Sequence, residues 1–260
     1  FLLAAWHSAN KFALCSRSAA SVLNFAFVMR VECRWVGRMP YKECWELQQQ
    51  LFDELLAKRG EESDLVGTII FVEHPAVYTL GKSGNISNML IDEARLKALG
   101  AEFYHIDRGG DITFHGEGQV VCYPILDLQK LGIGLKRYIE LLEQSIIEAV
   151  AEYGIDACRL AGATGVWLCD RVENAEGESI ERNWRKICAI GVKASRYVTM
   201  HGLALNASTD LKWFTMINPC GFVDKGVTSI TKELSREVSF DEASKVLCEK
   251  LLANFNLQTP

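Results

Sequence analysis

Residues 108–119 hold four glycines in twelve positions, with an arginine at one end and a histidine near the other. Glycine weakens a strand, so packing alone explains this run badly, whereas glycine lets a backbone approach a ligand closely. Arg108 and His115 would then anchor polar groups of that ligand. The alternative is a tight hairpin with a bulge, because 103–106 and 111–114 read as strands on either side of the first glycines.

Lys186 is the second candidate, because it begins an otherwise apolar strand. A lysine in such a place can be partly buried, and burial lowers the pKa of an amine toward neutral pH. It could then exchange protons in a reaction. The alternative is a strand-end lysine that reaches out to solvent, and Lys193 is a rival for the same role.

Cys220 is the third candidate, because it lies between proline and glycine on a turn. The other eight cysteines lie in the first 28 residues or in apolar, periodic segments, where a small buried side chain is the default. A turn cysteine is better placed to be exposed. As a thiolate it can attack a thioester, provided that a neighbouring cation lowers its pKa.

The composition bounds the class of protein that must position these residues. The chain has 260 residues, of which 49% are hydrophobic and 23% charged, with a formal net charge of −5. These values are typical of a folded globular chain. The charge and the lack of a basic block argue against a protein whose main role is to bind nucleic acid. Nine scattered cysteines without a C-x-x-C pair predict free thiols in a reducing compartment and no metal site.

Residues 1–28 contain Lys11 and Arg17 but no acidic residue. We expect this leader to be an upstream reading-frame artefact before Met29, with a transit peptide as the alternative. Its uncharged stretch is too short to span a bilayer. The prediction is therefore one domain over 29–260, in the cytoplasm, or in the mitochondrion if the leader is a transit peptide.

From residue 31 onward, the pattern predicts an α+β fold on a mostly antiparallel or mixed sheet, with packed helices. The residues 170–186 form a polar insertion that predicts a mobile surface loop. Pro124 is expected to end its strand. The predicted strands are 31–36, 68–72, 77–80, 103–106, 111–114, 120–124, 165–169, 187–194 and 203–206, and the predicted helices are 41–59, 92–99, 135–153 and 240–255.

Four ordered motifs resemble the octanoyltransferases of lipoate biosynthesis: R-G-G-D-I-T-F-H-G-E-G-Q at 108–119, K-I-C-A-I-G at 186–191, H-G-L-A-L-N at 201–206 and N-P-C-G at 218–221. The segment E-H-P-A-V-Y-T-L-G at 73–81 is similar to the H-P-x-x-x-T-L-G segment of that family. The resemblance covers roughly residues 31–232. It implies a catalytic domain of the biotin/lipoyl protein ligase kind.

The resemblance also implies a reaction and its residues. Cys220 corresponds to the nucleophile that forms an acyl-thioester, and Lys186 to the lysine that activates it and transfers protons. The donor would be octanoyl-acyl carrier protein, and the acceptors would be lipoyl domains of 2-oxoacid dehydrogenases and the glycine-cleavage H protein, with no cofactor, metal, nucleic acid or membrane. The substrate-binding positions would be Arg108, Gly109, Gly110, Asp111, Ile112, Thr113, Phe114, His115, Ala189, Ile190, Gly191, Gly202, Leu203 and Ala204, with His74 and His201 as further pocket residues. Glu117 departs from the proline that is more usual in the family and leaves the loop conformation open.

Three other functions stay open from the sequence. An ATP-dependent lipoate or biotin protein ligase would share the fold and the lysine, although no G-x-x-x-x-G-K-[ST] loop is present. A non-catalytic acyl- or lipoyl-domain-binding protein would need neither Cys220 nor Lys186. A cysteine hydrolase would need a further residue to orient its base, and none stands out.

Overall fold

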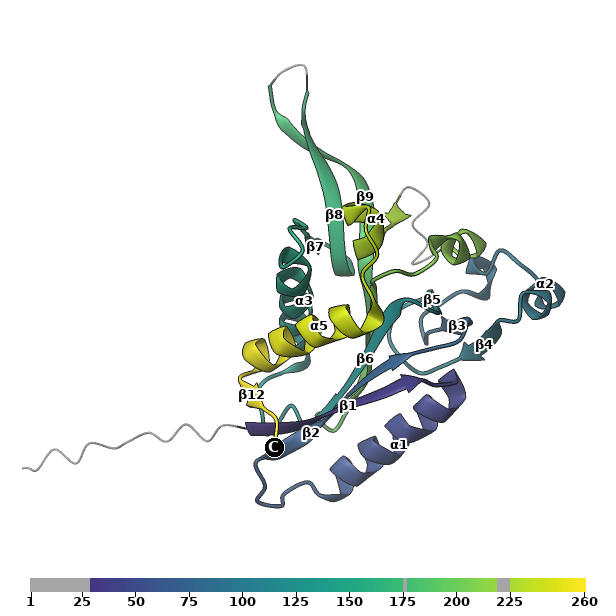
Figure 1. The fold of residues 1–260 in the computed structure, drawn as a ribbon. Helices are drawn as coiled ribbons and strands as arrows, with labels where there is room; N and C mark the ends of the chain where they lie inside the picture. The colour runs from purple at the N-terminus through teal and green to yellow at the C-terminus, as the bar shows by residue number, and fades with distance from the viewer. Residues whose placement is uncertain (1–28, 175–176, 219–224) are drawn as a thin grey trace, which may run out of the picture.

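The computed structural model describes residues 29–174, 177–218 and 225–260. In this part of the chain a nine-stranded sheet has the order β12-β1-β2-β6-β10-β9-β8-β7, and β11 pairs with β9 (Figure 1). The predicted leader lies outside the described residues. The strands are β1 (Met29–Arg38), β2 (Leu65–Glu73), β6 (Gln119–Leu126), β7 (Cys158–Leu160), β8 (Ala163–Glu173), β9 (Ser179–Ser195), β10 (Val198–Asn206), β11 (Gly226–Val227) and β12 (Leu257–Gln258).

The sheet is mixed. β1 runs parallel to both β2 and β12, whereas β2, β6, β10, β9 and β8 pair in antiparallel fashion. This confirms the predicted α+β class.

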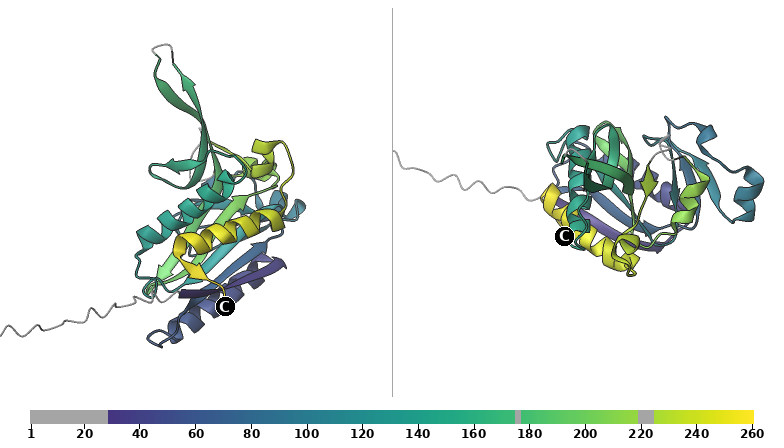
Figure 2. Two further views of the ribbon diagram at one scale, coloured as in Figure 1. Left: turned by 60° about the vertical axis from the view of Figure 1, so that its left-hand side comes forward. Right: turned by 90° about the horizontal axis from the view of Figure 1, so that it is seen from above.

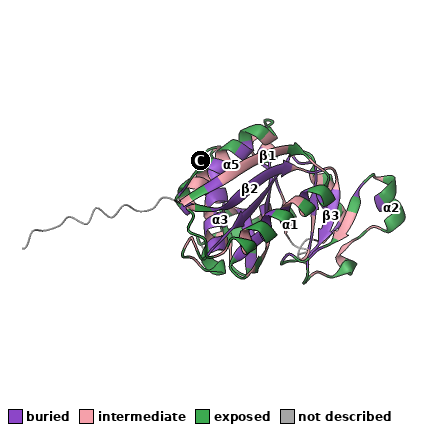
Figure 3. Cartoon of the chain, turned by 90° about the horizontal axis from the view of Figure 1, so that it is seen from below, coloured by how far each residue is buried: buried purple, intermediate pink, exposed green. Residues whose placement is uncertain are grey.

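Helices cover both faces of the large sheet (Figures 2 and 3). α1 (Tyr41–Ala57) packs on one face against alternate residues of β6, including Val121 and Ile125. α3 (Leu135–Ala151) and α5 (Phe240–Phe255) pack on the other face, against residues such as Val120 and Cys122. Because both of its faces are covered, β6 is buried along its whole length. None of the helices among the described residues is long and apolar enough to cross a membrane.

A second, three-stranded sheet has the order β4-β3-β5. The alternative interpretation of a tight hairpin around Arg108-Gly109-Gly110 is wrong, because β3 lies between the two flanking strands and pairs with both. The residues between β4 and β5 therefore cross over the end of β3. The sheet and its neighbours are β3 (Val77–Leu80), β4 (Glu102–His105), β5 (Ile112–His115), the short helix α2 (Glu93–Ala98) and the 3₁₀ helices η1 (Ile86–Asn88) and η2 (Leu211–Met216).

The insertion at 170–186 is a strand pair over most of its length, not the predicted mobile loop. Ladder partners run from Asp170 and Arg182 outward to Glu173 and Ser179. β8 and β9 therefore continue as a two-stranded arm that projects beyond the rest of the fold (Figure 1). Arg185, at the base of this arm, pairs with Asp170 at 2.8 Å and with Glu233 at 2.7 Å. Glu233 belongs to α4 (Ile230–Leu234), so the base of the arm is tied to the main body.

Pro124 does not end its strand, because β6 continues to Leu126. A proline lacks the N–H that a ladder needs. The hydroxyl of Thr199 compensates: it donates to Pro124 O at 2.8 Å and accepts from Leu126 N at 3.0 Å. A side chain of β10 thus replaces part of the backbone ladder beside the proline.

Candidate active site

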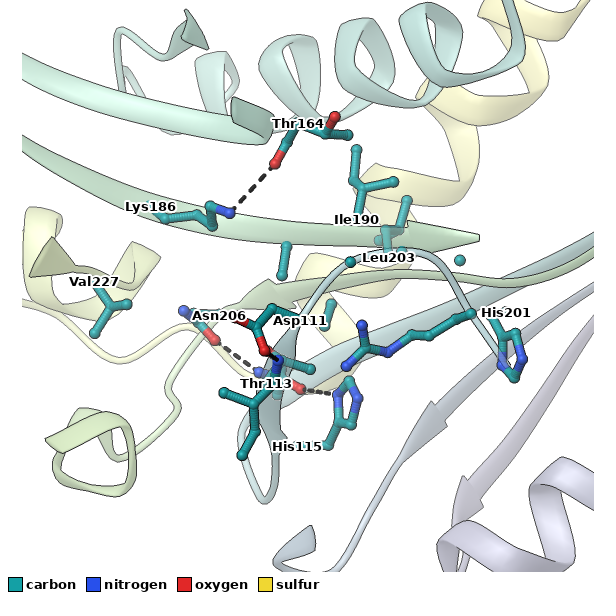
Figure 4. Close-up of a pocket in the computed structure, with 18 of the residues that line it drawn as sticks. Asp111, Thr113, His115, Thr164, Lys186, Ile190, His201, Leu203, Asn206 and Val227 are labelled. Atoms are coloured by element: carbon teal, nitrogen blue, oxygen red, sulfur yellow. Dashed lines mark hydrogen bonds between the residues drawn. The ribbon is translucent and has the colours of Figure 1, made fainter. Parts of the chain in front are cut away.

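A cavity of about 290 Å³ lies between β5 and residues of β6, β9 and β10 (Figure 4). Its apolar wall includes Ile190, Leu203, Ala204 and Val227. Polar groups lie at separate points of the wall, with Lys186 at one side and His115 at another. A small, largely apolar cavity with a few polar groups is typical of a site for a small ligand.

Lys186 is half-buried at the cavity wall, where β9 pairs with β8. Its amine donates to Thr164 O at 3.3 Å and lies 4.6 Å from the ring centroid of Trp167. Gly165 lets β8 lie close to β9 beside this lysine: its φ is +121°, and a β-carbon there would lie 2.6 Å from Cys188 O. Backbone and ring contacts therefore hold the amine at the cavity.

Arg108 lies in the crossover between β4 and β5 and is buried. Its guanidinium donates to the backbone oxygen of Thr79 at 2.7 Å, to the hydroxyl of Thr79 at 2.9 Å and to Gly109 O at 2.9 Å. The crossover packs directly on β9, because Gly191 has no side chain there. A β-carbon on Gly191 would lie 2.8 Å from Gly109 O and 3.0 Å from Arg108 Cδ. Glycine is required at this contact.

A chain of hydrogen bonds leads from Arg108 along the cavity wall. The Thr79 hydroxyl, which accepts from Arg108, lies 3.4 Å from His115 Nε2. His115 Nδ1 lies 2.9 Å from Gln119 Oε1. Gln119 Nε2 in turn donates to Asn206 Oδ1 at 2.9 Å.

This chain of hydrogen bonds ends at the backbone oxygen of Lys186. Asn206 Nδ2 donates to Thr228 O at 2.9 Å, and Thr228 N donates to Lys186 O at 3.0 Å. A single direction of donation satisfies every member: the hydroxyl of Thr79 donates to His115 Nε2, and His115 Nδ1–H donates to Gln119. This chain connects the small sheet to the large one across the cavity.

Burial keeps three histidines neutral near the site. It lowers the pKa of His74 to about 4, of His115 to about 3 and of His201 to about 4. His74 Nδ1 donates to Met39 O at 2.7 Å, so its Nε2 accepts from the hydroxyl of Tyr123 at 2.9 Å. These histidines therefore act as oriented donors and acceptors at neutral pH.

The structure brings most of the predicted site residues to one cavity. Three of them lie elsewhere: Gly109 faces β9, Phe114 packs on Tyr78 and η2, and His74 lies behind Tyr123. Phe114 points away because side chains alternate along β5. Cys220 lies outside the described residues. The predicted residues that line the cavity are Arg108, Gly110, Asp111, Ile112, Thr113, His115, Lys186, Ala189, Ile190, Gly191, His201, Gly202, Leu203 and Ala204.

Some cavity residues were not predicted from the sequence. Tyr41 begins α1, Tyr123 lies on β6, and Thr164 is the second residue of β8. Gln119 and Asn206 close two of the recognised motifs and could have been found there. Tyr41 and Tyr123 carry no local signal, because each looks like a core residue of its own element.

Comparison with known proteins identifies the family. The lipoyl protein ligase A/B catalytic domain matches residues 40–252. An octanoyltransferase of Bacteroides fragilis (strain YCH46) is 54% identical over 83% of this chain and 93% of its own length. One of Flavobacterium johnsoniae is 46% identical over 88% of this chain and 98% of its own length. The chain belongs to the octanoyltransferase family. As a member of that family it is an acyltransferase enzyme.

Solved structures agree with the fold of this octanoyltransferase. A bipartite lipoate protein ligase of Thermoplasma acidophilum has a TM-score of 0.64 at 15% identity, over 89% of this chain and 86% of that one. A lipoate-protein ligase A bound with ATP has a TM-score of 0.63 at 13% identity, over 89% and 88%. These likenesses confirm the predicted ligase-like architecture.

Proposed function

We propose that this octanoyltransferase moves an octanoyl group from octanoyl-acyl carrier protein to a lysine of a lipoyl domain, through a thioester on Cys220. The acceptors are lipoyl domains of 2-oxoacid dehydrogenases and the glycine-cleavage H protein, and the reaction is the first step of endogenous protein lipoylation. The family membership supports octanoyl transfer, and the cavity supports an acyl substrate.

The surroundings of Lys186 carry the assignment of its role. Val227, which follows Cys220 closely in the sequence, pairs with Lys186 in register and lines the cavity. This pairing supports the proposal that Cys220 acts close to Lys186. A cation next to a thiol favours the thiolate, which is the form that attacks.

The transfer then takes two balanced steps. The Cys220 thiolate attacks the carbonyl carbon of the donor thioester, the bond to the pantetheine sulfur breaks, and that sulfur leaves as a thiol after taking a proton from the Lys186 ammonium. In the second step the acceptor lysine attacks the new thioester and releases Cys220, while neutral Lys186 takes the proton of the attacking amine. Thioester-to-amide transfer runs downhill, so no nucleotide is needed.

The apolar wall suits an eight-carbon chain. Each methylene removed from water contributes about 0.8 kcal/mol, so the cavity favours octanoyl over shorter groups. A difference of one methylene changes preference by only about 10–200-fold. Chain-length selection by Ile190, Leu203 and Ala204 is therefore expected to be graded rather than absolute.

We place the enzyme in the cytoplasm. Seven cysteines among the described residues are free, which fits a reducing compartment. Cys33 and Cys248 remain thiols although their sulfur atoms lie 3.6 Å apart. Fractionation of the native host, with an antibody to the enzyme, tests this placement.

The reaction itself is tested by supplying two donors to the purified enzyme and a lipoyl domain. With octanoyl-acyl carrier protein and no nucleotide, we expect the lipoyl-domain lysine to gain one octanoyl group by intact mass. With free octanoate and ATP we expect no gain. Modification only in the second mixture would contradict the proposal and identify an ATP-dependent ligase.

A further inference from the structure

Asp107 joins the crossover between β4 and β5 to the large sheet. Its Oδ2 lies 2.6 Å from Lys193 Nζ on β9, and its Oδ1 lies 3.0 Å from His201 Nε2 on β10. Burial raises the pKa of Asp107, but the hydrogen bonds from Lys193 and His201 outweigh this and hold it below the usual value. The Asp107 carboxylate therefore accepts hydrogen bonds from side chains on two neighbouring strands.

His201 adopts a backbone conformation that is unusual for a histidine. Its φ is +61° in the middle of β10. The ladder between β10 and β6 has its last partners at Leu203 and Cys122, so His201 falls opposite Pro124, which has no N–H to donate. The strand is free to depart from regular geometry at this point.

The departure has a consequence for the side chain. Lys193 pairs with Met200, the residue before His201. In a regular strand His201 and Met200 would point to opposite faces, so His201 and Lys193 would be separated by the sheet. In the structure both contact the same carboxylate. Backbone strain of this kind persists where the surrounding structure requires it, and it points to a role.

The crossover that Asp107 holds forms part of the cavity wall. On one side it is bonded to the end of β3, where Lys82 N donates to Arg108 O at 2.9 Å. On the other side Gly109 N donates to Val192 O on β9, also at 2.9 Å. Arg108 and Gly110 both line the cavity. A shift of this segment away from β9 would therefore move the wall relative to Lys186.

We propose that Asp107, Lys193 and His201 form a clamp, and that this clamp positions residues 106–111 against β9 for acyl transfer. The three are positioning residues, since they act through the crossover. The inference rests on the octanoyl transfer proposed above. Because Asp107 is about half exposed, with 48% of its side chain accessible, its ion pair contributes little to global stability. The clamp is expected to affect local order and rate instead.

The clamp is tested on the full chain with Asp107→Asn, Lys193→Met and His201→Gly. Glycine at 201 tolerates the positive φ and removes only the imidazole. Asp64→Asn is the matched control, because Asp64 also pairs with one cation at 2.6 Å, far from the cavity. Two quantities are measured: amide hydrogen exchange of the peptide covering residues 106–111, and kcat and KM for octanoyl transfer from octanoyl-acyl carrier protein.

We expect each clamp variant to raise exchange of this peptide at least about tenfold, and to lower kcat more than KM changes, by about 10–100-fold. Asp64→Asn should change neither. The double variant Asp107→Asn with His201→Gly should lose about as much as one single variant, because the two residues act through one contact. Additive losses would show that the two residues act independently and would overturn the proposal.

The measurements distinguish failure of the clamp proposal from failure of the proposed octanoyl transfer. Unchanged exchange in all three variants would overturn the clamp, whatever the activity. Raised exchange with unchanged kcat would overturn its role in positioning. If the unmodified enzyme transfers no octanoyl group, the proposed function fails, while the exchange data still decide whether the clamp holds the segment.

Discussion

Neutral histidines decide how the polar groups of the cavity are arranged. Because burial lowers the pKa of His115 to about 3, its ring carries one proton at neutral pH and can both donate and accept. Donation to Gln119 leaves Nε2 to accept from Thr79, and Thr79 can then accept from Arg108. A charged His115 would break this order beside a buried guanidinium. The arrangement of the wall thus depends on single side chains.

Thr79 is the residue on which this chain of hydrogen bonds depends most. Thr79→Val removes the hydroxyl and leaves His115 Nε2 without its donor in a buried place. We expect a loss of about 1–3 kcal/mol in the free energy of unfolding. Urea denaturation measures it. Thr215→Val is the control, because it removes an exposed hydroxyl that donates to Lys212 O. An equal loss of stability in both variants would contradict the role of the buried hydrogen-bond chain.

Lys186 should matter for rate far more than for stability. Lys186→Met keeps an unbranched side chain beside Trp167 but has no amine. We expect acylation of Cys220 to slow about 10²–10⁴-fold, as for loss of a group that transfers protons, with little change in the unfolding midpoint. Rapid-quench mass measurement follows the acylation. Lys250→Met, which breaks an ion pair on α5, is the control, and equal rates in both variants would refute the assignment.

At the scale of elements, the sequence predicts what is encoded within one segment. The strand at 77–80 and the helix at 240–255 are found at the predicted bounds, and Asp92 caps α2 by accepting from Arg95 N at 2.7 Å. Which strands become neighbours is encoded between segments. Nothing local shows that β3 lies between β4 and β5, or that Thr199 supports the strand through Pro124.

The site residues divide in the same way, into those that a local sequence pattern reveals and those that only contacts between segments reveal. Glycines and the lysine stood out because their types are unusual for a strand, and Gly110, Lys186, Gly191 and Gly202 do line the cavity. Tyr41 and Tyr123 did not stand out, because an aromatic residue on an amphipathic helix or a buried strand is ordinary. The contact of Asp107 with His201 was also hidden, since 94 residues separate the two and an unusual backbone angle brings them together.

The projecting arm should be separable from the cavity. In its outer ladder, from Arg171 and Glu181 to Glu173 and Ser179, β8 and β9 pair with each other and with no other described strand. Replacing residues 172–180 with Asn-Gly supplies a tight turn between Arg171 and Glu181. We expect the unfolding midpoint to change by less than about 3 °C and acylation of Cys220 to keep its rate. A large loss of acylation would show that the arm contributes to donor binding.

At the scale of the whole molecule, the cavity exists only where the two sheets and α1 meet, so its integrity depends on the complete fold. The three buried histidines therefore link the site to global stability. Their pKa values in the folded state lie below the ordinary 6.5, so the unfolded chain binds protons first. Their contribution is complete above pH 6.5 and is lost as the pH falls toward about 4.

This linkage predicts a steep acid dependence. Each of these histidines should make the free energy of unfolding about 2 kcal/mol lower at pH 5 than at pH 7.5. Urea denaturation at both pH values measures the difference. His74→Gln should reduce the pH dependence, whereas His105→Gln, at an exposed position on β4, should not. Equal stability at the two pH values would show that the histidines are not held neutral by burial.

The thioester on Cys220 is the central claim, and intact mass measures it directly. The enzyme is mixed with octanoyl-acyl carrier protein, without nucleotide or acceptor, and weighed before and after hydroxylamine treatment. We predict a gain of one octanoyl group that hydroxylamine removes, that Cys220→Ala abolishes and that Cys169→Ala retains. An enzyme that acylates a lipoyl domain yet never carries the group, or carries it equally in Cys220→Ala, would contradict the account.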